Sequence, residues 1–162
     1  GSLLEASPPE QEVQKYIEDH EILLHPYSAT RLFKKPAITP KYRADFAIHD
    51  ARGDLILIEI ERPGLQLLTK KGEISSELNH AFEQVTDWML KVEDHRQAIV
   101  DDFGLQPTEV NKILGVVIAG RDHSCDEHHL RKLKRISPRD GVRFFTYDDV
   151  LGQMDALIRV TT

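Results

Sequence analysis

ADFAIHDARGDLILIEIERP, residues 44–63, is the stretch of sequence that decides the fold. Two apolar runs, 44–49 and 55–60, flank a polar turn at 50–54, and this pattern predicts a β-hairpin. Residues 55–58 are apolar at every position, so we expect the second strand to be covered on both faces. The sequence RPG at 62–64 then ends that strand abruptly.

Three carboxylates interrupt this hairpin at positions where a buried strand would carry apolar side chains. Strand side chains alternate between faces, so pairing His49 with Leu55 would bring Asp45 opposite Glu59, with Glu61 on the same face. Carboxylates gathered on one face repel one another, and hard divalent cations prefer oxygen ligands. The pattern therefore favours a metal site formed by these three residues. The alternative is an antiparallel strand with a solvated acidic face.

The composition fits a globular domain, with 40% hydrophobic and 30% charged residues in a chain of 162. We expect a tag remnant and leader over residues 1–8 and a single domain over 9–162. No membrane-spanning run or signal peptide is visible, and a single cysteine, Cys125, suits a reducing compartment, so the expected location is cytoplasmic, without a membrane partner. The net charge of −6 argues against a simple nucleic-acid-coating protein but allows local basic patches.

The remaining sequence alternates between helical and strand patterns. The predicted elements are, in chain order, a helix from Ser7 to about 20, a strand near 32–33, the hairpin strands 44–49 and 55–60, a helix from Ser75 or Ser76 to about 92, a strand over 113–120, a helix over 130–136, a strand over 142–146, and a helix capped by 147–149 and ending near 160. This order predicts an α/β fold, in which a mixed β-sheet is flanked by helices.

The long helix carries an apolar stripe at helical spacing, which we expect to be buried. Its members are Leu78, Ala81, Phe82, Val85, Trp88, Met89 and Val92. Gln84 lies on the neighbouring polar face. The His123, Cys125, His128 and His129 cluster matches no zinc motif and is interpreted as a polar loop entering a helix.

Five ordered stretches resemble the Shedu-type nuclease domain of bacterial anti-phage defence, and the resemblance covers nearly the whole chain from about residue 10. They are YRADF at 42–46, IEIERP at 58–63, LNHA and QVTDW at 78–88, VIAGR at 117–121 and TYDDVL at 146–151. The hairpin with Asp45 and Glu59 also resembles the metal site of the PD-(D/E)xK nuclease superfamily. This resemblance implies a restriction-endonuclease-like sheet, with an α-β-β-β-α-β core followed by α-β-α.

The resemblance also implies roles for individual residues. Asp45 and Glu59 would ligate a catalytic Mg²⁺ or Mn²⁺, and Gln84 would face the site. A glutamate of the first helix would approach it, with Glu12 as the best match and Glu10 as the alternative.

Glu61 departs from the superfamily, which usually has a lysine at this position. A glutamate there can act as a general base or a second metal ligand, and Lys70 or Lys71 could return to the site from the following loop. The departure leaves open an altered mechanism or lost activity. The expected function is a metal-dependent endonuclease acting on double-stranded DNA as a homo-oligomer. The alternative is an inactive module for nucleic-acid binding or oligomerisation.

Basic residues outside the hairpin are candidates for contacts with nucleic-acid phosphates, although a charge run is equally typical of a solvated helix face. These candidates are Lys70, Lys71, Arg131, Lys132, Lys134 and Arg135.

Overall fold

The computed structural model of the chain describes residues 11–12, 14–15, 29–38, 40–136 and 141–153. The expected leader over 1–8, the alternative ligand Glu10 and the predicted end of the last helix near 160 lie outside these residues. Within the described chain, no helix combines the length and the apolar character that crossing a bilayer requires.

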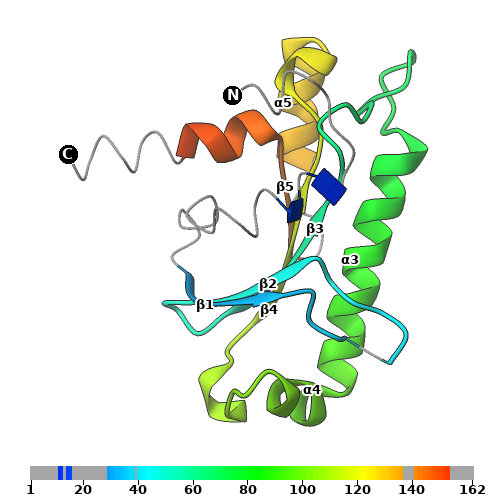
Figure 1. The fold of residues 1–162 in the computed structure, drawn as a ribbon. Coiled ribbons are helices and arrows are strands. Elements are labelled where there is room, and N and C mark those ends of the chain that lie inside the picture. The colour runs from blue at the N-terminus through cyan, green and yellow to red at the C-terminus, as the bar shows by residue number, and fades with distance from the viewer. Residues whose placement is uncertain (1–10, 13, 16–28, 39, 137–140, 154–162) are drawn as a thin grey trace, which may run out of the picture.

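A mixed sheet of five strands forms the centre of the fold (Figure 1). The strands lie in chain order across the sheet, with β1 and β2 antiparallel, β2 and β3 antiparallel, and β3, β4 and β5 parallel. Their bounds are β1 (Ala29–Lys34), β2 (Phe46–Asp50), β3 (Leu55–Ile60), β4 (Ile113–Ile118) and β5 (Val142–Phe145). The predicted α/β fold with a mixed, helix-flanked sheet is therefore confirmed.

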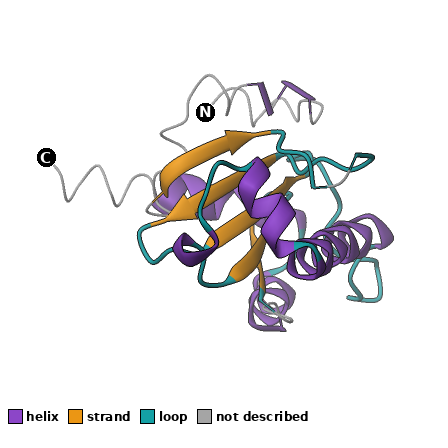
Figure 2. Cartoon of the chain, turned by 90° about the horizontal axis from the view of Figure 1, so that it is seen from below, coloured by secondary structure: helices purple, strands orange, loops and turns teal. Residues whose placement is uncertain are grey.

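Helices connect and cover these strands, as Figure 2 shows from below. The helices of the central and C-terminal parts are α3 (Ser76–Asp94), α4 (Arg96–Asp102), α5 (Glu127–Ile136), the 3₁₀ turns η2 (Pro107–Glu109) and η3 (Asp122–Ser124), and a helix that includes residues 147–153. The short helix α4 was not predicted. It has no side-chain cap at its N-terminus, so the sequence does not separate it from the end of α3.

Both faces of the sheet are buried, each against a different layer. Alternating residues such as Ala47 and Leu57 pack with the apolar stripe of α3 and with Leu130 and Leu133 of α5. The residues between them, such as Ile58, pack on the other face with apolar side chains of the helix that includes 147–153. All six residues of β3 are buried, as expected for a strand covered on both faces.

The N-terminus of α3 is fixed by Ser75, whose hydroxyl accepts a hydrogen bond from the Leu78 N–H at 3.2 Å. Of the predicted stripe, all members except Phe82 and Met89 are buried. Those two are half-buried because they lie at the edge of the stripe. Phe82 reaches β5, where its ring meets Phe144 edge-on at 6.1 Å.

The cap of the last helix differs from the prediction. Thr146, rather than the 147–149 segment, is the capping residue. Its hydroxyl accepts from the Asp149 N–H at 3.2 Å, and its own N–H donates to the Asp149 carboxylate at 3.0 Å. This reciprocal pair is a capping box, in which threonine serves as the cap and the acidic residue lies three positions later.

Candidate active site

The hairpin brings two of the predicted carboxylates together. His49 pairs with Leu55 and Ala47 with Leu57, as the turn predicted. Asp45 lies directly before β2, and one of its oxygens, Oδ2, accepts a hydrogen bond from the Ile60 N–H at 2.7 Å. The Glu59 carboxyl lies close enough to the Asp45 carboxyl to act on its pKa. We call these two residues the carboxylate pair.

Burial governs the electrostatics of the carboxylate pair. Glu59 is only 6% exposed, on the face of the sheet that α3 covers. Burial raises the pKa of the Asp45 carboxyl, and the Ile60 N–H, Glu59, the positive charge of Lys35 and the Gln14 amide partly oppose that rise. A carboxyl whose charged form is disfavoured by burial gains from a nearby cation, which favours the ionised form.

Among the described residues of the first helix, which are 11, 12, 14 and 15, Gln14 contacts the pair. It is buried, and its Nε2 donates to Oδ1 of Asp45 at 2.9 Å. Glu12, the residue chosen from the sequence, is exposed. The resemblance directed attention to acidic residues and so passed over an amide. The available signal was the spacing, because Gln14 borders the apolar positions 13 and 17 of the predicted helix.

Glu61 lies just after β3 and is half-buried. Its backbone is held on both sides, since its N–H donates to the Ile118 carbonyl at 2.8 Å and its carbonyl accepts from the Tyr147 hydroxyl at 2.6 Å. Over the residues that the structure describes, no three or more histidine, cysteine, aspartate or glutamate side chains are grouped to hold a metal ion. The expected three-carboxylate cluster is thus a pair, with Glu61 beside it in the chain.

Gln84 is half-buried on α3, the helix that covers the face carrying Glu59. Lys91 lies seven residues later and therefore on the same flank of the helix. The Lys91 ammonium is 4.1 Å from the centre of the Tyr42 ring, in the segment that leads into Asp45. Gln84 thus occupies the flank of α3 that faces this segment.

Comparison with protein families decides which family this chain belongs to. The family model described as "Shedu protein SduA, C-terminal" matches residues 7–151, which is most of the chain. The chain belongs to the Shedu family. Membership suggests a role in anti-phage defence. The chain matches none of the curated proteins with which it was compared.

The basic residues of this Shedu-family chain separate into two groups. Lys134 forms salt bridges within the domain, since its ammonium lies 2.8 Å from the Asp149 carboxylate and 3.3 Å from the Asp122 carboxylate. Arg131 pairs with Glu127 at 2.9 Å on the surface of α5. The other four candidates, Lys70, Lys71, Lys132 and Arg135, are exposed.

Two basic segments distant in the sequence meet in the Shedu fold. The turn that carries Lys70 and Lys71 ends at Gly72, whose φ is +80°. A Cβ atom at Gly72 would lie 2.9 Å from Nε2 of His129, so the turn packs directly on α5. Lys132 lies one helical turn beyond His129 on the same side of α5. We call Lys70, Lys71, Lys132 and Arg135 the basic surface.

A polar network joins the segments that follow β4 and β5, which are two of the five family-like stretches. Nη2 of Arg121 donates to Asp148 at 3.0 Å, its Nε donates to the same carboxylate, and the Asp122 N–H donates to it at 2.7 Å. Burial alone would raise the pKa of Asp148, but Arg121 and the Asp122 N–H outweigh burial and hold it below its usual range.

Replacing Asp148 with asparagine should lower the free energy of unfolding by about 1–2 kcal/mol at neutral pH, because both side chains of the ion pair remain partly solvated. The folded-state pKa of Asp148 is depressed, so the stabilisation exists at neutral pH and is lost as the pH falls through that value. Urea titrations at several pH values would measure this. The variant should lose less stability in acid than the wild type does. Asp87→Asn, in an exposed pair with Lys91, is the matched control.

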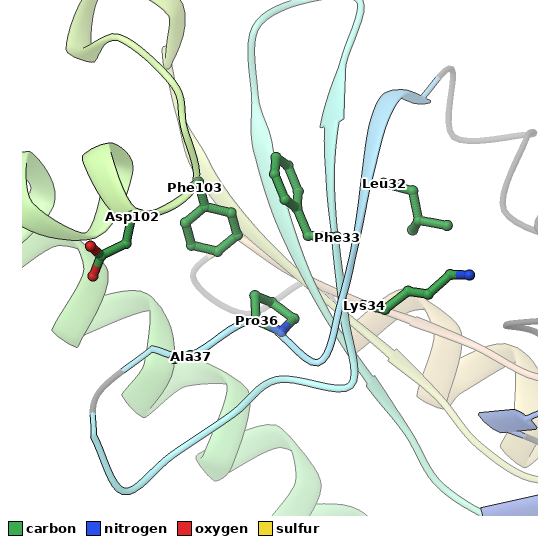
Figure 3. Close-up of a pocket in the computed structure, with 7 residues that line it drawn as sticks. All are labelled: Leu32, Phe33, Lys34, Pro36, Ala37, Asp102 and Phe103. Carbon is green, nitrogen blue, oxygen red and sulfur yellow. The ribbon is translucent and has the colours of Figure 1, made fainter.

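A separate hollow lies at the β1 edge of the sheet (Figure 3). It has a volume of about 610 Å³, and its lining residues are Leu32, Phe33, Lys34, Pro36, Ala37, Asp102 and Phe103. Neither member of the carboxylate pair lines it. The pair therefore qualifies as the candidate site by its chemistry rather than by being part of a deep cavity.

Proposed function

We propose that this Shedu-family chain is a divalent-cation-dependent endonuclease domain that hydrolyses phosphodiester bonds of double-stranded DNA. The observation that carries the proposal is the carboxylate pair, in which the register of the hairpin and the hydrogen bond from the Ile60 N–H bring Asp45 beside the buried Glu59. Placing a half-buried and a buried acid side by side costs stability, so such a pair is more readily explained by a function than by folding.

The residues present fit a hard cation. Mg²⁺ is commonly held by one or two carboxylates together with substrate phosphates, so Asp45 and Glu59 suffice as the protein's share of ligands for Mg²⁺ or Mn²⁺. When bound, such a cation supplies positive charge that stabilises the phosphoryl oxygens during the reaction. The N–H of Ile60 and the amide of Gln14 orient the Asp45 carboxylate.

In the proposed reaction a water oxygen forms a bond to phosphorus, and the bond from phosphorus to the leaving sugar oxygen breaks. Glu61 is the proposed base that accepts the proton of the attacking water. The leaving sugar oxygen takes up a proton from solvent water, and Glu61 returns its proton to solvent, so charge and atoms balance. Gln84 is proposed to position the water or the phosphate from the flank of α3.

The basic surface is the proposed contact with the DNA backbone. Replacing Lys70 and Lys71 together with alanine should weaken DNA binding and lower the slope of log affinity against log salt by about 2, since each phosphate contact contributes about 0.9. Fluorescence anisotropy across a salt series would measure the slope. Lys112→Ala is the control. It removes an exposed lysine that lies just before the start of β4, at the end of the strand opposite to the one that leads to α5, and it should leave the slope unchanged. Equal slopes for all three proteins would exclude this surface.

The alternative function is a nuclease-fold module without catalysis, which binds nucleic acid or assembles a defence complex. The specific feature in its favour is Glu61, at the position where the superfamily usually has a lysine. Glutamate places a negative charge at a position where the superfamily has a positive one, and that charge opposes an anionic substrate.

One experiment separates the two functions. The purified chain is incubated with supercoiled and linear DNA in Mg²⁺, Mn²⁺ or EDTA, and Mn²⁺ binding is measured by calorimetry. The nuclease proposal expects cation-dependent nicking or linearisation that EDTA abolishes. Wild-type protein that binds no Mn²⁺ and cuts no DNA in either cation would favour the inactive module.

A further inference from the structure

Lys35 has a backbone conformation that is unusual for a residue with a side chain. It directly follows β1, and its φ of +46° is the one positive value outside glycine among the described residues. The left-handed region favours glycine or asparagine, and another residue there costs about 1 kcal/mol or more. The chain thus keeps a lysine at a position where glycine would be less strained, and such outliers concentrate at functional sites.

The backbone of Lys35 lies beside the carboxylate pair. Lys34 pairs with Phe46 across β1 and β2, so the next residue along, Lys35, stands opposite Asp45. The Lys35 N–H donates to the Asp45 carbonyl at 2.9 Å, and the Lys35 carbonyl accepts from the Arg43 guanidinium at 3.0 Å. These two contacts fix the backbone of Lys35 relative to the residue that carries the carboxylate.

The side chain of Lys35 combines proximity to the pair with access to solvent. Burial is the main cause that raises the pKa of Asp45, and the positive charge of Lys35 opposes that rise. The Lys35 ammonium is therefore close enough to act on the Asp45 carboxyl. The residue is nevertheless exposed. Its neighbours Lys34 and Pro36 line the hollow at the β1 edge (Figure 3), so the backbone of Lys35 passes beside that open surface.

Resting on the nuclease function proposed above, we propose that Lys35 is a catalytic residue whose ammonium binds a non-bridging oxygen of the scissile phosphate. A phosphodiester anion that approaches Asp45, Glu59 and Glu61 meets net negative charge, and a cation at the rim would offset that repulsion. The lysine acts as a fixed point charge and a hydrogen-bond donor, and it keeps its proton throughout. Lys70 and Lys71 are poorer candidates, because their turn packs on α5.

Lys35→Asn tests the role, because asparagine tolerates the left-handed conformation and removes the charge. Cleavage in Mg²⁺ should fall roughly 100-fold, the scale of losing one donor to a developing charge. The melting temperature should not fall. Mn²⁺ binding measured by calorimetry should be unchanged or tighter, because a cation beside the metal ligands has been removed. Lys35→Arg, which keeps the charge, should retain cleavage within about tenfold of wild type.

Lys34→Asn is the matched control. It removes the same charge one position earlier, where the side chain points away from Phe33 and Phe103 on the other side of β1 (Figure 3). Its cleavage rate should stay close to that of the wild type. If Lys35→Asn cleaved DNA at the wild-type rate, the inference about Lys35 would be overturned while the nuclease proposal would stand. If Lys35→Asn lost both Mn²⁺ binding and cleavage, the role of Lys35 would be structural and the inference would also be overturned. A wild type that binds Mn²⁺ but cuts no DNA would overturn the nuclease proposal, and the inference with it.

Discussion

Replacing Asp45 with asparagine should abolish cleavage of DNA while the chain stays folded. Asparagine has the same shape, so it can still accept the hydrogen bond from the Ile60 N–H. It carries no negative charge, so the proposed cation site loses half of its protein ligands. We expect cleavage to fall at least about 100-fold and Mn²⁺ binding in calorimetry to weaken in parallel. Glu59→Gln should behave in the same way.

The same substitution should change the pH dependence of stability. The folded-state pKa of Asp45 is raised, so the folded chain binds the proton more tightly than the unfolded chain does. In the metal-free wild type this contribution to the free energy of unfolding is present at low pH and is lost as the pH rises through the folded-state pKa. Asp45→Asn removes the titrating carboxyl, and with it this loss of stability as the pH rises. Urea titrations in EDTA should therefore show a variant at least as stable as wild type at neutral pH.

Asp54→Asn is a matched control for this prediction. Asp54 is buried, at 7% exposed, and lies in the turn at the other end of the hairpin, where it accepts from the Lys112 N–H at 3.2 Å. Its loss should cost stability and leave cleavage intact. If Asp45→Asn cut DNA at the wild-type rate, the carboxylate pair would not be the active site.

Local rules accounted for the parts of this fold that depend on neighbours in the chain. The alternation of residues 44–60 fixed the register of the hairpin, because a slip of one residue would turn Leu55 and Leu57 to the wrong face. Ser75 was among the two candidate caps of α3 because serine accepts from the N–H three residues later. Both features depend on short-range geometry that the sequence displays directly.

The parts that failed depend on contacts between distant segments. The basic run of α5 contained no sign that Lys134 pairs with Asp149, since that contact requires α5 and the last helix to lie side by side. Nor did it show that the turn at Gly72 packs on His129. Gln14 was missed for the same reason, because its partner Asp45 lies on another element. The position of Lys35 opposite Asp45 likewise depends on the pairing of β1 with β2.

The largest loss of stability should follow from Trp88→Ala in α3. Trp88 is 1% exposed and lies in the apolar layer between the helix and the sheet. Its removal leaves a cavity that the surrounding structure can fill only in part, so the free energy of unfolding should fall by about 3–5 kcal/mol. Leu90→Ala is the control on the same helix, since Leu90 is 58% exposed and should cost less than about 1 kcal/mol.

The α3 variant also reports on the site. Gln84 lies one turn before Trp88, so a helix that settles into the cavity moves the flank that we propose faces the carboxylate pair. Trp88→Ala should therefore lower cleavage even at temperatures where the chain remains folded, whereas Leu90→Ala should not. Chemical denaturation measures the first effect and the plasmid assay the second. A loss of stability below about 1 kcal/mol would show that this stripe does not pack as the core of the domain.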